Sequence, residues 1–79
     1  MTLNERIQEI MDLIEMAFNA EVAIAPDSTL AVLGFDSLDT IELLLLLEER
    51  FPEAKLEDYE PGTETTVRQI AEEIERRLA

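Results

Sequence analysis

Apolar residues recur at intervals of three and four along the first part of the chain, with acidic residues between them. The apolar positions are Leu3, Ile7, Ile10, Met11, Ile14, Ala17 and Phe18. This spacing is typical of an amphipathic helix, and Thr2 followed by Glu5 has the form of an N-terminal capping box. The pattern therefore predicts a helix from Leu3 to Phe18.

Two further helices are predicted later in the chain. A second helix fits Ser37 to Phe51 and is ended by Pro52, which cannot continue a helix. Thr66 and Gln69 form another candidate capping box. The helix expected after it has its own apolar stripe, which consists of Val67, Ile70, Ala71, Ile74 and Leu78.

The segments between these helices are irregular. Segment 19–35 breaks the pattern at Pro26 and Gly34, but it is too apolar for a free linker and is expected to pack against the helices. Leu56–Tyr59 can form one short helical turn, and no strand-like alternation or internal repeat is present. The expected fold is all-α, a small bundle of three main helices plus one short helix, with residues 1–79 as a single domain.

The charge of the chain is strongly negative and unevenly distributed. The formal net charge is −13, and residues 27–64 hold eleven acidic and two basic residues, whereas residues 65–79 are balanced. Such a field repels nucleic acid and anionic lipid and favours partners with basic patches, although a solvated surface would look the same. We expect no nucleic-acid partner.

Nothing in the sequence indicates membrane insertion or export. No apolar run approaches the roughly 18 residues of a membrane span, and the start of the chain, Thr2-Leu3-Asn4-Glu5, is not a basic signal-peptide region. These features predict a soluble cytoplasmic protein.

Most side-chain chemistry is unavailable to this chain, because it contains no cysteine and no histidine. A catalytic thiol, thiolate metal sites and the commonest general base are therefore excluded. A calcium loop is also a poor fit, because DSLDTIELLLLLE has no glycine at its sixth position. We expect neither catalytic residues nor a metal site.

The second predicted helix has more apolar residues than one buried face needs. At roughly 100° per residue, one side carries Thr40, Leu43, Leu44, Leu47 and Phe51 and is expected in the core. The opposite side carries Leu38, Ile41 and Leu45, interleaved with Glu42, Glu48 and Glu49, and Leu46 lies on the flank beside Asp39. Another helix could bury this side, but the unpaired carboxylates make that costly, so an exposed docking surface is the better interpretation.

Ser37 is predicted at the first position of that helix, directly after Asp36, a good N-cap residue. Helix capping is the ordinary explanation for such a serine. Nucleophilic catalysis is disfavoured, because no histidine is present and Lys55 is the nearest lysine in sequence. A phosphate ester made by another enzyme is compatible with the position, since a helix N-terminus favours an anion.

The stretch GFDSLDTIEL resembles the attachment motif of acyl carrier proteins, Gly-x-Asp-Ser-Leu-Asp-x-x-Glu-Leu. The resemblance covers the whole chain, since the order and length of the predicted helices are also similar. It implies that a magnesium-dependent phosphopantetheinyl transferase attaches 4′-phosphopantetheine from coenzyme A to Ser37, with Asp36 helping to position the serine. The arm ends in a thiol, so the protein would carry acyl groups as thioesters without being an enzyme itself.

The resemblance also implies partners. They are acyl-transferring and condensing enzymes of fatty acid, polyketide or related biosynthesis, with basic docking patches, and the carrier is expected to act as a monomer. The apolar contacts would be Leu38, Ile41 and Leu45, and the carboxylates that meet the partner's Lys and Arg would be Asp39, Glu42, Glu48 and Glu49. Candidates for lining an acyl cavity, as well as forming the core, are Leu43, Leu44, Leu47, Ile70 and Ile74.

Three features depart from the usual pattern of this family. Phe35 and Leu46 stand where smaller residues are common, and segment 52–67 does not follow the usual sequence of the third helix. The main alternative from another class is an acidic helical adaptor that binds a basic partner, with Ser37 only a helix cap. Ser37→Ala distinguishes the two, because an adaptor loses at most a modest capping contribution.

Overall fold

The computed structural model describes residues 2–18 and 22–79. Its elements are α1 (Leu3–Phe18), α2 (Ser37–Arg50), η1 (Pro52–Ala54), η2 (Leu56–Asp58) and α3 (Val67–Leu78), where η denotes a 3₁₀ helix. The described residues contain no β-strand, only an isolated bridge between Thr29 and Thr66. The predicted all-α bundle of three main helices is confirmed. None of the helices in the described residues has the length and hydropathy of a membrane span.

The predicted helix bounds differ from the observed ones mainly around Pro52. Helix α2 ends at Arg50 rather than Phe51, and η1 was not predicted. Proline has a fixed φ and no N–H group, so it ends one helix and suits the first position of the next turn. The predicted short turn at Leu56–Tyr59 is present as η2, which ends one residue earlier, at Asp58.

Both predicted capping boxes are present. At the start of α1, the Thr2 N–H donates to Glu5 Oε1 (2.8 Å) and the Glu5 N–H donates to Thr2 Oγ1 (3.2 Å). At the start of α3, the Thr66 N–H donates to Gln69 Oε1 (2.9 Å) and the Gln69 N–H donates to Thr66 Oγ1 (3.0 Å). Each box pairs backbone donors that have no partner inside the helix.

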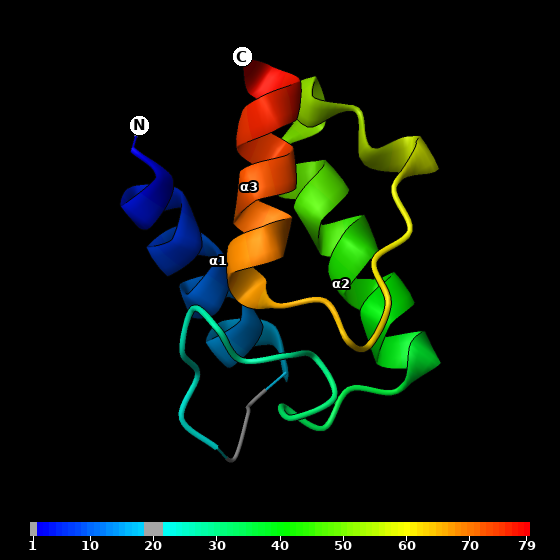
Figure 1. Ribbon diagram of the computed structural model, residues 1–79. Coiled ribbons are helices and arrows are strands. Elements are labelled where there is room, and N and C mark those ends of the chain that lie inside the picture. The colour runs from blue at the N-terminus through cyan, green and yellow to red at the C-terminus, as the bar shows by residue number, and fades with distance from the viewer. Residues whose placement is uncertain (1, 19–21) are drawn as a thin grey trace.

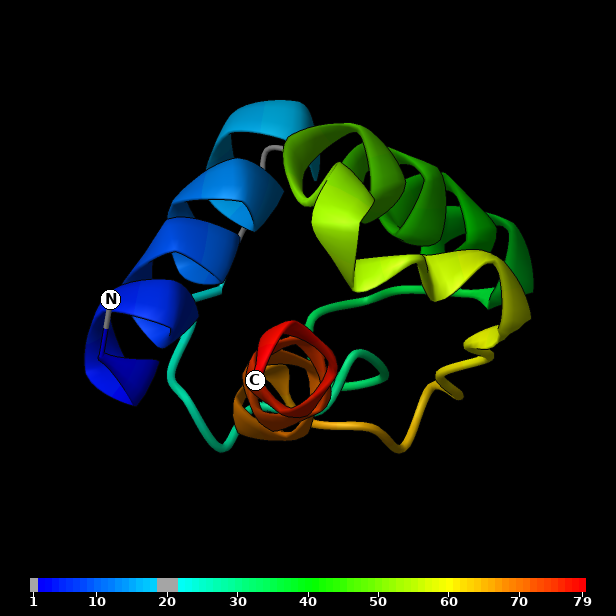
Figure 2. The same cartoon turned by 90° about the horizontal axis from the view of Figure 1, so that it is seen from above.

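Helices α1 and α3 pack against each other in opposite directions, and α2 closes the other side of the core (Figure 1). Seen along α3, the helix lies between α1 on one side and α2 with the short η helices on the other (Figure 2). All three helices, the η helices and the loop before α2 contribute to one core. Its buried residues are Ile7, Ile10, Ile14, Leu30, Leu33, Phe35, Leu43, Leu47, Phe51, Ala54, Leu56, Val67, Ile70, Ala71 and Ile74. Ala17, from the predicted apolar stripe of α1, is exposed.

The loop before α2 packs down as predicted over its described part, whereas residues 19–21 of the predicted segment lie outside the described residues. Two backbone bonds tie it to the segment before α3, from the Leu30 N–H to Thr65 O (3.0 Å) and from the Ala31 N–H to Thr63 O (2.8 Å). The loop also places Phe35 against Phe18, with ring centroids 4.7 Å apart. The large side chain of Phe35 therefore packs in the core beneath the loop.

Candidate functional site

A tight turn before α2 sets the position of the predicted attachment serine. The Phe35 N–H donates to Leu30 O and the Gly34 N–H donates to Ala31 O, both at 3.0 Å. These two bonds form a Schellman motif, which ends a helical turn at a residue with left-handed backbone conformation. Gly34 is that residue, with a positive φ of 89°. The turn directs Phe35 into the core and delivers Asp36 to the start of α2.

Asp36 caps α2 as predicted, and the cap uses Asp39 rather than Ser37. The Asp39 N–H donates to Asp36 Oδ1 (2.9 Å), and the Asp36 N–H donates to Asp39 Oδ2 (3.2 Å). Thr40 Oγ1 also donates to the Asp36 carbonyl (2.9 Å). Asp39 therefore has a structural role in the helix cap, and its contact with a partner stays a prediction.

Ser37 is exposed at the first position of α2. Within the described ranges, its hydroxyl makes no hydrogen bond, and the N–H groups of Ser37 and Leu38 have no acceptor. Capping, the ordinary explanation for this serine, is thus performed by its neighbours. A phosphodiester on Ser37 fits this environment, because an accessible hydroxyl adjoins unpaired backbone donors at the positive end of a helix.

A pocket of about 320 Å³ lies beside Ser37, between α2 and residues 60–63. Figure 1 shows the chain segment before α3 running down beside α2. From α2 the pocket is lined by Ser37, Thr40, Ile41 and Leu44, and from the segment by Glu60, Pro61, Gly62 and Thr63. We call residues 60–63 the pocket wall. The lining is mostly apolar, so the pocket suits an apolar chain attached near Ser37.

Most of the residues considered as cavity lining are plain core residues, as their apolar periodicity favoured. Of the five candidates only Leu44 lines this pocket, while Leu43, Leu47, Ile70 and Ile74 are fully buried in the core. The pocket wall was not anticipated, because residues 60–63 are irregular backbone and have no periodic pattern that assigns them a face. The Pro61-Gly62 pair indicated only a turn.

The predicted exposed side of α2 is confirmed. The exposed fractions of Leu38, Ile41 and Leu45 are 68%, 55% and 57%, so no other helix buries this face. We call these three residues the apolar stripe. Leu46 is half-buried on the flank. Apolar side chains exposed together on one helix are typical of a binding surface.

The carboxylates beside the apolar stripe are left without internal cations. Arg50, the one basic residue of α2, donates instead from Nε to Glu9 Oε2 of α1 at 2.8 Å. In the described part of the chain, Glu42, Glu48 and Glu49 form no ion pair. The negative charge on this face therefore stays available to an external cation.

The acidic residues do not form a metal site within residues 2–18 and 22–79. No group of three or more carboxylates is arranged to hold a metal ion there.

The chain is similar in sequence to a known family and to several known proteins. The profile described as "Phosphopantetheine attachment site" matches residues 5–74. The chain is 34% identical over 73 residues to acyl carrier protein 4, chloroplastic, of Arabidopsis thaliana, covering 90% of this chain and 53% of the relative. It is 36% identical over 80 residues to acyl carrier protein 1, chloroplastic, of Spinacia oleracea, covering 94% and 54%.

The chain thus spans about half the length of the curated relatives that it matches. No solved structure gives a significant match.

Proposed function

Because the chain belongs to the phosphopantetheine attachment-site family and is similar to acyl carrier proteins, we propose that Ser37 is the residue that receives 4′-phosphopantetheine. When bound, this group supplies a terminal thiol that holds acyl groups as thioesters, which the cysteine-free chain lacks. In this role the protein is a carrier and not an enzyme. Residues 1–79 act as one carrier domain.

One observation supports Ser37 above all others. Its hydroxyl is exposed and makes no hydrogen bond in the described structure, although it lies at a helix start where serine commonly acts as a cap. The Asp36 and Asp39 pair performs the capping, so a modifying enzyme can use the Ser37 hydroxyl without breaking the cap. Asp36 has the further role of holding the start of α2, and thereby Ser37, in a fixed position for the transferase.

The docking surface for partner enzymes is proposed to be the exposed side of α2. The apolar stripe gives apolar contact area, and the carboxylates beside it are Asp39, Glu42, Glu48 and Glu49. Unpaired carboxylates attract a basic patch and orient it during encounter. The partners are a phosphopantetheinyl transferase and acyl-transferring or condensing enzymes, each binding the monomeric carrier through basic residues.

The pathway and compartment are finer proposals. The similarity to plant acyl carrier proteins favours fatty acid biosynthesis over polyketide biosynthesis. The relatives are named chloroplastic, so a plastid location is the alternative to the predicted cytoplasmic one. A fluorescent fusion of the full-length protein expressed in its source cells, imaged beside a plastid marker, would distinguish the two compartments.

The attachment proposal is tested by intact mass. The protein is incubated with coenzyme A, magnesium and a broad-specificity phosphopantetheinyl transferase, with Ser37→Ala as the test variant and Ser28→Ala as the matched control. Wild type and Ser28→Ala should each gain one phosphopantetheine, and Ser37→Ala should gain none.

Circular dichroism shows that each sample is folded before the reaction. A gain by Ser37→Ala would move the attachment point to another residue. No gain by folded, initially unmodified wild type would favour the acidic adaptor, which needs no modification.

A further inference from the structure

The two sides of the pocket beside Ser37 are held in different ways. One side is helix α2, whereas the pocket wall is irregular backbone. Within the wall and just after it, the Gly62 N–H donates to Thr65 Oγ1 (3.0 Å) and the Thr65 N–H donates to Gly62 O (3.1 Å). In the described structure, no backbone hydrogen bond joins residues 60–62 to another element. The position of the wall therefore depends on what holds its two ends.

The end of the wall nearer α3 is held by the loop before α2. The Ala31 N–H donates to Thr63 O (2.8 Å), and the Leu30 N–H donates to Thr65 O (3.0 Å). Leu30 is fully buried, so these bonds are anchored in the core. This end of the wall is fixed by backbone contacts.

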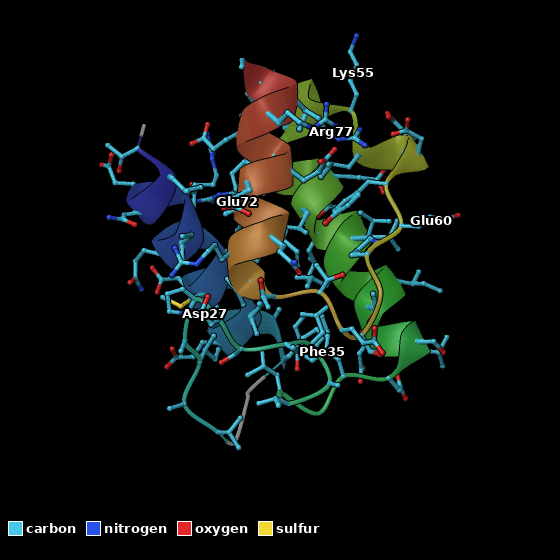
Figure 3. All side chains as sticks on the ribbon, in the orientation of Figure 1. Asp27, Phe35, Lys55, Glu60, Glu72 and Arg77 are labelled. Atoms are coloured by element: carbon cyan, nitrogen blue, oxygen red, sulfur yellow. The ribbon has the colours of Figure 1, made fainter. Side chains whose placement is uncertain are left out.

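At the other end, the buried side chains of Ala54 and Leu56 pack in the core, and one side chain from the last turn of α3 adds the polar contacts. Arg77 Nη1 donates to the Lys55 carbonyl and to Asp58 Oδ1, each at 2.8 Å. The Arg77 guanidinium also lies 5.5 Å from the centroid of the Tyr59 ring, directly before the wall. Figure 3 shows Arg77 between α3 and the connection that carries the η helices, while the Lys55 side chain points away from the fold.

Two further features make this contact specific. Lys55 has a left-handed backbone, with φ of 51°, and its carbonyl is the acceptor for Arg77. That conformation is unfavourable for a residue with a side chain, so the connection benefits from an external partner. Glu73 accepts a hydrogen bond from Arg77 Nε and fixes the guanidinium. The Arg77 side chain is only 18% exposed.

Arg76 provides a natural comparison at the next position. It has the same charge, but it pairs only with Glu73, and its side chain is 69% exposed. It makes no hydrogen bond to residues 55–63 in the described structure. The contact of Arg77 with the connection is therefore a matter of position and not of charge alone.

We propose that Arg77 is a positioning residue for the pocket, which holds the wall at residues 60–63 against α2 from the far end of α3. Through the pocket it controls how far an apolar cargo attached at Ser37 is shielded from water. This second step rests on the proposed carrier function, whereas the positioning of the wall does not.

The first experiment uses the unmodified protein and compares Arg77→Leu with Arg76→Leu by residue-resolved hydrogen exchange. Loss of the two charge-assisted bonds should raise exchange of the Tyr59, Gly62 and Thr65 amides on the order of tenfold in Arg77→Leu. Arg76→Leu should leave these rates unchanged. The amides of Ile10 and Leu47 report the core and should keep wild-type rates in both variants.

Two gentler variants keep the test decisive if Arg77→Leu fails to fold. Asp58→Asn removes one ionic acceptor and should raise exchange at the same three amides by less than Arg77→Leu. Arg77→Lys keeps the charge without the planar fork and should retain only part of the protection. Equal exchange in the Arg77 and Arg76 variants, or a rise that is uniform across the core, would overturn the proposal.

The second experiment uses wild type, Arg77→Leu and Arg76→Leu loaded with a hexanoyl group, and measures spontaneous loss of the acyl group at neutral pH. Faster loss in Arg77→Leu alone is expected, together with smaller chemical-shift changes at Leu44 and Thr63 on loading. Equal rates and shifts in all three proteins would overturn the role in shielding cargo. Failure of Ser37 to accept the arm would overturn that role as well, while the exchange experiment still reports on the wall itself.

Discussion

Gly34 shows how much of the site depends on a single backbone conformation. Its φ of 89° ends the turn that delivers Asp36 and Ser37 to α2, and the turn has two backbone hydrogen bonds. Open space surrounds the position where a Cβ would lie, so any effect of a side chain here comes from the backbone conformation and not from a clash. A substitution at this position therefore tests the cost of backbone strain without a contribution from side-chain clashes.

Gly34→Ala is expected to destabilise the fold by about 1 kcal/mol or somewhat more, because L-residues disfavour this region of φ. Urea unfolding of wild type and variant measures the difference. Gly62→Ala is the control, since Gly62 has equally open surroundings and is not in the positive-φ region. Equal stability of Gly34→Ala and wild type would show that the turn can end in another way.

Glu73 connects the stability of the fold to pH through the last turn of α3. Hydrogen bonds from Arg76, and then from Arg77, lower the pKa of Glu73 from 4.5 to about 2. A carboxyl whose pKa is lower in the folded state stabilises the fold above its unfolded pKa, and this contribution is lost as pH falls through the folded value. The relevant window therefore runs from about pH 4.5 down to about pH 2.

We expect Glu73→Gln to be less stable than wild type at pH 6, with the difference shrinking as pH falls towards 2. The difference between the two proteins is the quantity to follow, because protonation of the other acids also changes the stability of both. Urea unfolding at several pH values measures it, and Glu72→Gln, at an exposed neighbour, is the control. A difference that does not change with pH would contradict the assignment.

Among the helices, α2 is distinctive because it carries apolar residues on two opposite sides. Its inner side places Leu43 and Leu47 in the core, and its outer side exposes the apolar stripe. A helix that is apolar on two sides is usually buried, so exposure of the second side is a cost to solubility, which the proposed binding of a partner would offset. The unpaired carboxylates beside the stripe reduce the tendency of that face to self-associate.

Leu45→Ser is expected to weaken docking without weakening the fold. The exposed side chain does not line the pocket or pack in the core, so the KM for the transferase should rise about fivefold or more, which corresponds to about 1 kcal/mol. The melting temperature should stay within about 2 °C of wild type, because changes at exposed sites are usually small.

Met16→Ser is the matched control, because Met16 is 82% exposed but lies on α1. An equal rise of KM in both variants would point to a general effect of surface polarity. An unchanged KM in Leu45→Ser would remove that residue from the docking surface for this partner.

In the whole molecule, the arginines pair with carboxylates outside the face proposed for docking. Each of the five arginines pairs with a carboxylate, and these carboxylates are Glu9, Asp27, Asp58, Glu73 and Glu75. Within the described structure none of these pairs includes Glu42, Glu48 or Glu49. The face proposed for docking therefore keeps its share of the net charge of −13 without internal compensation.

This distribution predicts that salt stabilises the fold from a low starting concentration. Raising NaCl from about 10 to about 200 mM shortens the Debye length from roughly 30 to below about 10 Å and screens repulsion among the acids. The melting temperature should rise by several degrees, since about 1 kcal/mol shifts it by roughly 4–8 °C in a domain of this size. Thermal melts followed by circular dichroism measure the change.

A Glu48→Gln, Glu49→Gln double variant is the control for this prediction. It should melt at a higher temperature than wild type in low salt and gain less from added NaCl. A melting temperature that stays constant or falls as salt is added would mean that weakening of the arginine pairs outweighs relief of repulsion.

Features that depend on neighbouring residues along the chain can be predicted from the sequence. The helices, both outer capping boxes and the two-sided character of α2 follow from contacts between residues three and four apart, which a helix repeats in every turn. The motif around Ser37 is likewise contiguous. The sequence was enough to predict the cap at Asp36, which the structure confirms, and its resemblance to a carrier motif led to the prediction that Ser37 is the attachment residue. These contacts are local, and a single sequence contains them in full.

Features that join residues distant in sequence depend on the packing of the fold, and the sequence did not predict them. Arg50 could have paired with its neighbours on α2, but the packing of α1 brings Glu9, 41 residues away, within 2.8 Å of it. The pocket wall has no repeating pattern either. The same is true of the hydrogen bond from Arg77 to the carbonyl of Lys55, 22 residues away in the connection before the wall. Such contacts depend on how the helices pack and where irregular backbone runs between them, and neither spacing nor composition specifies that arrangement.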